Sequence, residues 1–184
     1  MKYLYKLLIL IIFLCICITS CNEKATVKRI MTDFVESEIV IPNDLECIYS
    51  RHADKIKLDT LEQLKLIVYY DSLDCSSCRI SHLSDVYPLY DMADTSNFSV
   101  LTIFSPREED LAEVRNHIVI QNLPIPIYID ADGSFSKLNK SIPSDKRFHS
   151  FLIDDNNKPV FVGNPLFDSN LIGLFKKVLY NQTY

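Results

Sequence analysis

Two cysteines, Cys75 and Cys78, form the sequence CSSC, with two residues between them. A pair at this spacing can close a disulfide, exchange electrons or hold a metal ion. The pair follows the apolar run LKLIVYYD, residues 64–71, and precedes a segment with helical character, residues 75–92. A cysteine at a helix start faces unpaired N–H groups and the positive end of the helix dipole, which favour the thiolate. We therefore predict thiol exchange rather than a zinc knuckle, with Cys75 as the attacking sulfur and Cys78 as the resolving one.

The other cysteines have different contexts. Residues 1–20, MKYLYKLLILIIFLCICITS, carry two lysines, then an apolar run short for a membrane span, then small polar residues, which is typical of an export signal. The sequence ITSC at residues 18–21 resembles a bacterial lipobox, so Cys21 is expected to be acylated, with palmitate among its lipids. Cys15 and Cys17 would leave with the signal. The alternative is an uncleaved anchor or a secreted chain without lipid.

Composition and charge exclude several classes. The 184-residue chain has a formal net charge of −5, which becomes −7 once the signal leaves with its two lysines and no acid. No basic run supports nucleic-acid binding. The absence of GxGxxG and Walker A sequences gives no support to a nucleotide, and we expect no cofactor. About 160 mature residues suffice for one compact domain, which we assign to residues 39–184.

Hydrophobic periodicity predicts the elements that position the motif. Expected strands are 45–50, 55–59, 64–71, 98–105, 125–130, 148–154 and 158–163. Expected helices are 75–92, kinked or shortened by Pro88, then 107–118, 135–139 and 168–181, the last capped by Asp168 or Ser169. Alternation of strands and helices predicts an α/β fold: a mixed sheet with central parallel strands, a C-terminal β-hairpin and helices on both faces.

The segment over residues 21–38 is expected to be a lipidated tether followed by an amphipathic helix from residue 26. Apolar residues recur there at helical spacing: Val27, Ile30, Met31, Phe34 and Val35. We favour packing of this face on the domain over a membrane-surface role, because the polar face mixes basic and acidic side chains.

The order strand, CxxC, helix, strand, helix, strand, hairpin, helix resembles the thioredoxin fold, in the variant of TlpA-like and AhpC/TSA-like proteins. The pieces YYDSLDCSSC and FHSFLIDDNNKPVFVGNP, with the lipobox, resemble thioredoxin-like lipoproteins of Bacteroidota. The resemblance implies an envelope thiol–disulfide oxidoreductase that acts on protein disulfides or thiols with an unidentified electron donor. It also implies a lipid anchor in the outer membrane, which is expected to be the chain's only link to a membrane. Glu23 is followed by Lys24, so no dense acidic tract follows Cys21, and we expect the domain to face the periplasm.

The motif departs from that family at several positions. Asp74 replaces the usual tryptophan and opposes a thiolate by like charge, which Arg79 can offset. Ser76 and Ser77 replace the Gly-Pro pair that helps to set the redox potential in thioredoxin. The family's buried acid would fall at Tyr69, with Asp71 nearby.

The family's cis-proline aligns with His149, and its usual threonine with Ser150. If His149 lies opposite the cysteines, then Cys75, Cys78 and His149 form a ligand set for Cu(I) or Zn, so metal binding is the alternative function. A non-catalytic thioredoxin-like lipoprotein is a further alternative. Cys47 is expected to be a buried, inert thiol, with a third redox thiol as the other interpretation.

Overall fold

The computed structural model describes residues 24–49, 52–55, 61–72, 80 and 83–183. Cys21 and the segment 73–79, which carries the CxxC motif with Asp74, Ser76, Ser77 and Arg79, lie outside these residues. The described residues form the frame to which the motif is joined.

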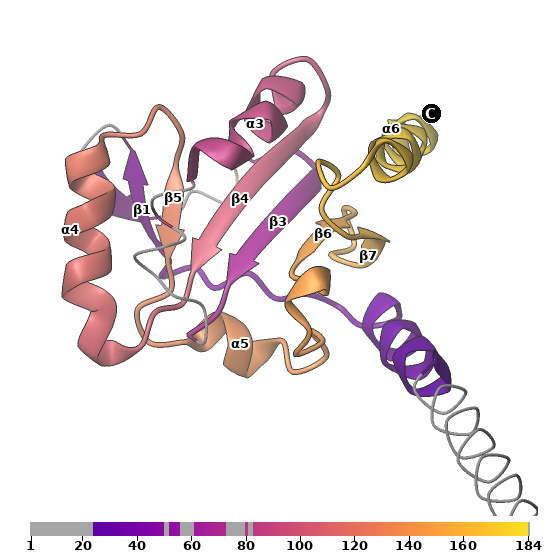
Figure 1. The fold of residues 1–184 in the computed structure, drawn as a ribbon, viewed down its shortest axis with the longest axis horizontal. Helices are drawn as coiled ribbons and strands as arrows, with labels where there is room; N and C mark the ends of the chain where they lie inside the picture. The colour runs from indigo at the N-terminus through magenta and orange to yellow at the C-terminus, as the bar shows by residue number, and fades with distance from the viewer. Residues whose placement is uncertain (1–23, 50–51, 56–60, 73–79, 81–82, 184) are drawn as a thin grey trace, which may run out of the picture.

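One seven-stranded mixed sheet runs through the described part of the chain, in the order β2-β1-β5-β4-β3-β6-β7 (Figure 1). Strands β3, β4 and β5 are parallel, and β6 and β7 form an antiparallel hairpin beside β3. The predicted mixed sheet with parallel central strands and a C-terminal hairpin is confirmed. The strands are β1 (Glu46–Tyr49), β2 (His52–Lys55), β3 (Leu64–Tyr70), β4 (Phe98–Phe104), β5 (Ile127–Ile129), β6 (Ser150–Ile153) and β7 (Pro159–Val162).

Strand β2 lies earlier than the predicted strand 55–59, of which residues 56–59 are outside the described part. Its sequence, HADK, lacks the apolar pattern that predicts a strand. Antiparallel pairing with β1 defines it instead, since Tyr49 lies opposite His52 and Glu46 opposite Lys55. Pairing with a neighbouring strand can form a strand that its own side chains do not predict.

Helical elements cover both faces of the sheet. They are a helix over residues 24–35, η2 (Leu83–Val86), α3 (Tyr87–Ala93), η3 (Glu108–Asp110), α4 (Leu111–Gln121), α5 (Ser134–Leu138), η4 (Lys146–Phe148) and α6 (Ser169–Thr183). Pro88 lies in the first turn of α3, where the N–H that it lacks would have no helical partner. Within residues 83–93 the predicted helix is therefore divided at the proline into η2 and α3, while residues 75–79, 81 and 82 of the prediction lie outside the described part. Asp168 caps α6, accepting hydrogen bonds from two backbone N–H groups of its first turn.

The two faces of the sheet have separate cores. On the first face, side chains of α3, α4 and α6 pack over Leu66 and Val68 of β3, and Ile80 joins this cluster with 1% exposure. On the second face, Phe34 and Phe135 pack against Ile67 and Tyr69. Alternation of side chains along each strand produces this division.

The helix over residues 24–35 packs on the domain only at its carboxyl end. Phe34 is fully buried, and its ring meets that of Phe151 edge-on at 5.1 Å between centroids. Met31 packs against the same cluster, whereas Ile30 and Val35 are 38% and 41% exposed. The predicted packing is confirmed for the last turn, and the rest of the helix points away from the sheet (Figure 1).

Asn139 ties the chain after this helix to the domain. Its side-chain oxygen accepts a hydrogen bond from Val40 N at 2.7 Å, and its amide donates to Val40 O at 2.8 Å. The same amide also donates to Phe135 O. Asn139 is 3% exposed, so these bonds satisfy a buried amide while fixing the chain that follows the helix. No helix within the described residues has the length and apolar character needed to span a membrane.

Candidate functional site

The carboxyl ends of β3, β4 and β5 lie side by side, because these strands are parallel neighbours. In open α/β sheets this edge is where ligands and reactive groups gather. Backbone bonds extend the pairing beyond the strands: Ser105 N donates to Tyr70 O at 2.9 Å, and Asp130 N donates to Phe104 O at 2.8 Å. The segment with the CxxC motif leaves the sheet from this edge, through Asp71 and Ser72.

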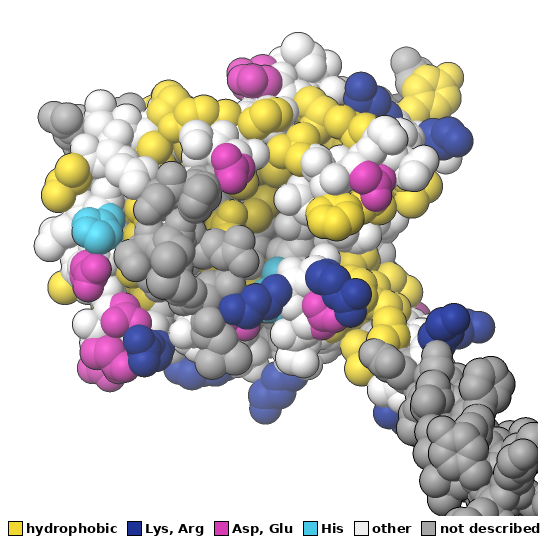
Figure 2. All heavy atoms as spheres, in the orientation of Figure 1, with side chains coloured by type: hydrophobic (Ala, Val, Ile, Leu, Met, Phe, Trp, Pro, Cys, Tyr) yellow, Lys and Arg dark blue, Asp and Glu magenta, His cyan; other side chains and the backbone are white. Residues whose placement is uncertain are grey.

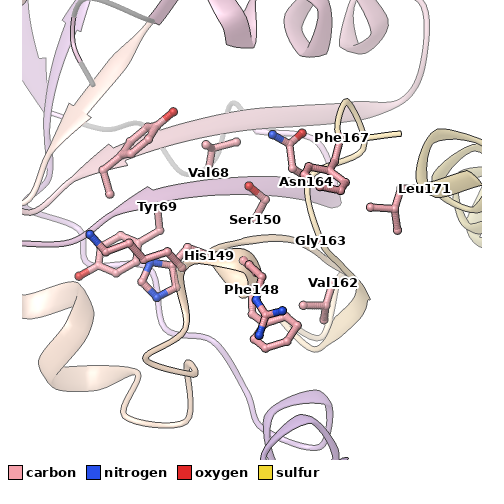
Figure 3. A pocket seen from close by; sticks show the side chains of 13 residues that line it. Val68, Tyr69, Phe148, His149, Ser150, Val162, Gly163, Asn164, Phe167 and Leu171 are labelled. Atoms are coloured by element: carbon pink, nitrogen blue, oxygen red, sulfur yellow. The ribbon is translucent and has the colours of Figure 1, made fainter. Parts of the chain in front are cut away.

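A pocket of about 400 Å³ opens beside this edge, between the β6–β7 hairpin and the start of α6 (Figure 3). Phe148, Val162 and Phe167 line it, and Phe167 is 80% exposed. The Arg147 guanidinium lies 5.6 Å from the centroid of the Phe148 ring. Hydrogen bonds from Arg147 lower the pKa of Asp145 below its usual value. In the space-filling view, hydrophobic side chains gather on this side of the molecule with basic side chains among them (Figure 2).

His149, which sequence reasoning placed near the motif, is 5% exposed. Its Nε2 lies 2.9 Å from Pro143 O, a carbonyl that can only accept, so Nε2 is the donor of this hydrogen bond. Nδ1 is buried with no hydrogen-bond partner among the described residues. No described residue has a cis peptide bond. His149 therefore takes the sequence position of the family's cis-proline but has a trans peptide bond.

Tyr69 and His149 lie together on the second face, on the side of β3 opposite Val68 (Figure 3). Their ring centroids are 5.3 Å apart, and Tyr69 N donates to His149 O at 2.9 Å. Ser150, 9% exposed, begins β6 opposite Val68, and its carbonyl accepts a hydrogen bond from Gly163 N. The structure thus brings His149 and Ser150 to the end of β3 from which the motif extends.

A buried polar network that the sequence did not predict lies at the same edge. Asp130 is 1% exposed, and its carboxylate accepts hydrogen bonds from Ser105 Oγ at 2.6 Å, Ser134 Oγ at 3.0 Å and Phe135 N at 3.1 Å. Burial raises the pKa of the Tyr69 hydroxyl, and hydrogen bonding with Ser105 and Ser136 partly offsets that rise. The Ser105 hydroxyl therefore lies between the buried Asp130 carboxylate and Tyr69. Tyr69 is the position where the resemblance to thioredoxin implied a buried acid.

One sequence signal could have found this network. Ser105 and Asp130 each come directly after a buried parallel strand, and such residues meet at one edge of a sheet. Asp71, the other acid considered near the motif, is half-buried.

Cys47 lies away from this edge, in β1 opposite Tyr128 of β5. It is half-buried rather than buried as predicted, because β1 is covered less completely than the central strands. Burial raises the pKa of the Tyr128 hydroxyl, and the neighbouring Cys47 thiol adds to the shift. Within the described residues, which omit Cys75 and Cys78, no three His, Cys, Asp or Glu side chains are grouped to hold a metal ion.

Comparison with known proteins agrees with this architecture. No protein-family model and no curated protein matches the sequence. Among solved structures, a proposed thioredoxin from Neisseria meningitidis is 18% identical, with 76% of this chain and 90% of that chain covered and a TM-score of 0.50. A thioredoxin-like protein from Porphyromonas gingivalis is 16% identical, with 80% and 95% covered and a TM-score of 0.46. AhpC from Enterococcus faecalis is 13% identical, with 79% and 90% covered and a TM-score of 0.49.

The chain has a thioredoxin-like fold, as its motif order and strand order also indicate. Identity this low extends to the fold alone. The chemistry must therefore be argued from the residues of this chain.

Proposed function

We propose that the protein is a thiol–disulfide oxidoreductase of the cell envelope in which Cys75 and Cys78 carry the reaction. One observation carries the proposal: the segment with CxxC extends from the carboxyl end of β3, at the edge where three parallel strands end. A reactive pair attached there is supported by a rigid sheet, and Ile80, just beyond the motif, is anchored in the first-face core.

The proposed reaction exchanges one disulfide for another. The Cys75 thiolate attacks a sulfur of a substrate disulfide, the substrate S–S bond breaks, and one substrate thiolate leaves. The Cys78 thiolate then attacks the Cys75 sulfur of the mixed disulfide and releases the second substrate thiolate. Two electrons pass from the dithiol to the substrate, and the same steps in reverse oxidise a substrate dithiol. The partners are envelope protein disulfides or thiols and an unidentified electron donor.

The side chains around the pair adjust its reactivity. Asp74 disfavours a thiolate at Cys75 by like charge, and Arg79 opposes that effect. Ser76 and Ser77 provide hydroxyl groups between the cysteines. His149 and Ser150 supply buried polar groups at the end of β3. Their positions beside Tyr69 and Val68 support this role.

The proposed location is the periplasmic side of the outer membrane, with the chain held by lipid, including palmitate, on Cys21. The lipobox ITSC and the preceding apolar run support this anchor. Neither depends on the chemistry of the CxxC motif, so the two parts of the proposal are tested separately.

Trapping of a mixed disulfide tests the chemistry. Cys78→Ser removes the resolving thiol, so a substrate captured by Cys75 is expected to stay attached and to migrate as a higher-mass species that dithiothreitol removes. Cys75→Ser and Cys47→Ser in the same background are the matched controls: the first should abolish the species and the second should leave it. Absence of any Cys75-dependent species with envelope extract or a model disulfide would overturn the catalytic proposal.

Metal binding is the second candidate, and the orphaned Nδ1 of His149 favours it. A histidine that binds a metal through one ring nitrogen commonly donates a hydrogen bond from the other to a backbone carbonyl. Nε2 of His149 makes such a bond to Pro143 O, and Nδ1 has no partner among the described residues. Cys75 and Cys78 would supply the thiolates of a Cu(I) or Zn site. Reduced protein should then bind one equivalent of Cu(I), with affinity lost in Cys75→Ser and lowered in His149→Leu. Unchanged affinity in His149→Leu, in a variant that unfolds at the wild-type denaturant concentration, would remove His149 from the site.

The reduction potential of the Cys75–Cys78 pair separates catalysis from a structural disulfide. A potential near that of glutathione, with exchange against it, is expected for the oxidoreductase. A pair that glutathione neither reduces nor oxidises would instead mark a non-catalytic module.

A further inference from the structure

The helix over residues 24–35 has an uneven charge along its length. Its first two turns carry Lys24, Lys28 and Arg29, all exposed. From residue 21 to residue 32, Glu23 is the one acidic residue against these three basic ones in the sequence. The acids Asp33, Glu36 and Glu38 follow in the next six residues, and each is exposed. The mixture of signs noted in the sequence is therefore a division between two ends.

Neither helix stability nor packing explains this division. Acids near the carboxyl end of a helix interact unfavourably with the helix dipole. Among the described residues, none of the three basic side chains forms an ion pair with the domain, whereas Phe34 alone is fully buried in this helix. Figure 1 shows the basic end as the end farther from the sheet. Ile30, 38% exposed beside Arg29, adds an apolar side chain to the same half.

We propose that Lys24, Lys28 and Arg29 bind the anionic headgroups of a phospholipid surface and seat the domain on the membrane that holds it. The inference rests on the proposed lipid attachment at Cys21, only three residues before Lys24. A lipid chain at that position brings the first turns of the helix to the headgroups, within the short distance over which an anionic surface attracts basic side chains. The acidic carboxyl end then faces away from the anionic headgroups.

The net charge of the whole chain gives the basic half of this helix a role in membrane contact. The mature protein is expected to be strongly acidic, so an anionic surface repels most of it. A basic segment at the attachment point offsets that repulsion locally. It would favour approach of the domain to the lipid through the N-terminal helix.

Lysine footprinting on the intact lipoprotein tests this binding. The full-length chain is expressed in a bacterial host, purified in detergent, checked by mass spectrometry for lipid on Cys21, and reconstituted into two kinds of vesicle. One contains phosphatidylethanolamine with phosphatidylglycerol, and the other phosphatidylethanolamine with phosphatidylcholine. Acylation of Lys24 and Lys28 by a water-soluble amine reagent is compared with that of the exposed Lys176 and Lys177 on α6.

Acylation of Lys24 and Lys28 is expected to fall roughly threefold or more in phosphatidylglycerol vesicles, and to recover in 1 M NaCl because salt screens the contact. Lys176 and Lys177 should react equally in both vesicles. The variant Arg29→Glu should raise Lys28 acylation in phosphatidylglycerol vesicles, and the control Lys176→Glu should not.

Equal acylation in the two vesicles, or protection that salt does not reverse, on chains with lipid on Cys21 would overturn the membrane contact alone. A mature chain without lipid on Cys21 would overturn the anchor and this inference together. The trapping experiment with Cys78→Ser would keep its meaning in either case.

Discussion

The two faces of the sheet differ in the chemistry of what they bury. The first face is covered by α3, α4 and α6, and its cluster consists of apolar side chains such as Leu89 and Phe175. Its buried polar residue in β4, Thr102, has its hydroxyl 3.0 Å from that of Tyr90. The second face, under α5 and the end of the N-terminal helix, contains buried polar groups beside its apolar ones: Asp130, Asn139 and His149. Buried polar groups cost free energy unless they are hydrogen-bonded, so each must be satisfied by a particular partner. The first face therefore serves stability, while the second fixes positions at the carboxyl edge.

The largest effect is expected on the first face, from Phe175→Ala. The Phe175 ring is fully buried and meets Phe98 and Phe161 edge-on at 5.4 and 5.2 Å. Its removal should lower the free energy of unfolding by about 3–5 kcal/mol through lost burial and a cavity. Urea titration followed by circular dichroism measures this. Leu174, the neighbouring residue, is 51% exposed, so Leu174→Ala is the control. It should lower the free energy of unfolding by less than about 0.5 kcal/mol. Equal losses would mean that α6 does not dock through Phe175.

A smaller effect is expected on the second face from Asp130→Asn. The carboxamide keeps the volume but replaces one acceptor by a donor. If the amide nitrogen takes the place of Oδ2, Ser105 Oγ and Phe135 N both lose their acceptor; if it takes the place of Oδ1, Ser134 Oγ loses its acceptor. We expect a loss of about 1.5–3 kcal/mol in the free energy of unfolding, the range for hydrogen bonds to a charged group. Glu113→Gln, an exposed carboxyl on α4, is the matched control. If both variants unfold at the same urea concentration as the parent, the polar network does not hold this face.

Alkaline pH should reveal Tyr69, which with Tyr128 is one of two buried tyrosines in the second-face cluster. Burial raises the pKa of Tyr69 in the folded state above its ordinary value of 10.0. The unfolded chain then loses its proton first, so stability is complete below about pH 10 and falls as the pH rises further. Tyr69→Phe should cost about 1 kcal/mol at pH 7 and flatten the decline between pH 9.5 and 11. Tyr49→Phe, whose ring is 51% exposed, should leave the decline unchanged. A decline as steep in Tyr69→Phe as in the parent would contradict a buried hydroxyl at this position.

The smallest effect is expected from His149→Leu, although His149 is as buried as Tyr69. The substitution removes one hydrogen bond, to Pro143 O, but also removes the unsatisfied Nδ1. These changes oppose each other, so stability should change by less than about 1 kcal/mol in metal-free protein. A loss above about 3 kcal/mol in urea titration would mean that Nδ1 has a partner beyond the described residues.

The fold was largely predictable because its elements are regular. LKLIVYYD and FSVLTIFS are continuous apolar runs of strand length, which is typical of strands covered on both faces, and both became central strands. Asp168, placed before an amphipathic segment, caps α6 through purely local bonds. By contrast, β2 has no pattern of its own and depends on pairing with β1.

The candidate site was predictable only in part. His149 and Ser150 were found because they align with the cis-proline and threonine of thioredoxin-like proteins, at the start of a recognisable strand. Asp130, Ser105 and Asn139 were not, since each is an ordinary polar residue after a strand or helix until its partners are known. Burial turns such residues into structural ones, and a side chain's burial depends on chain segments distant in sequence.

The sequence by itself determined the alternation of strands and helices, the CxxC spacing and the basic-to-acidic order of residues 24–38, because these are properties of neighbours along the chain. The tertiary structure alone decided that Asp130 of one strand end would meet Ser105 of another, and that Asn139 would hold Val40, 99 residues earlier. It also decided that only the last turn of the N-terminal helix would be buried, leaving its basic half outside the domain. Such contacts depend on how the sheet orders its strands, and pairing across long loops is the part of folding that local pattern does not encode.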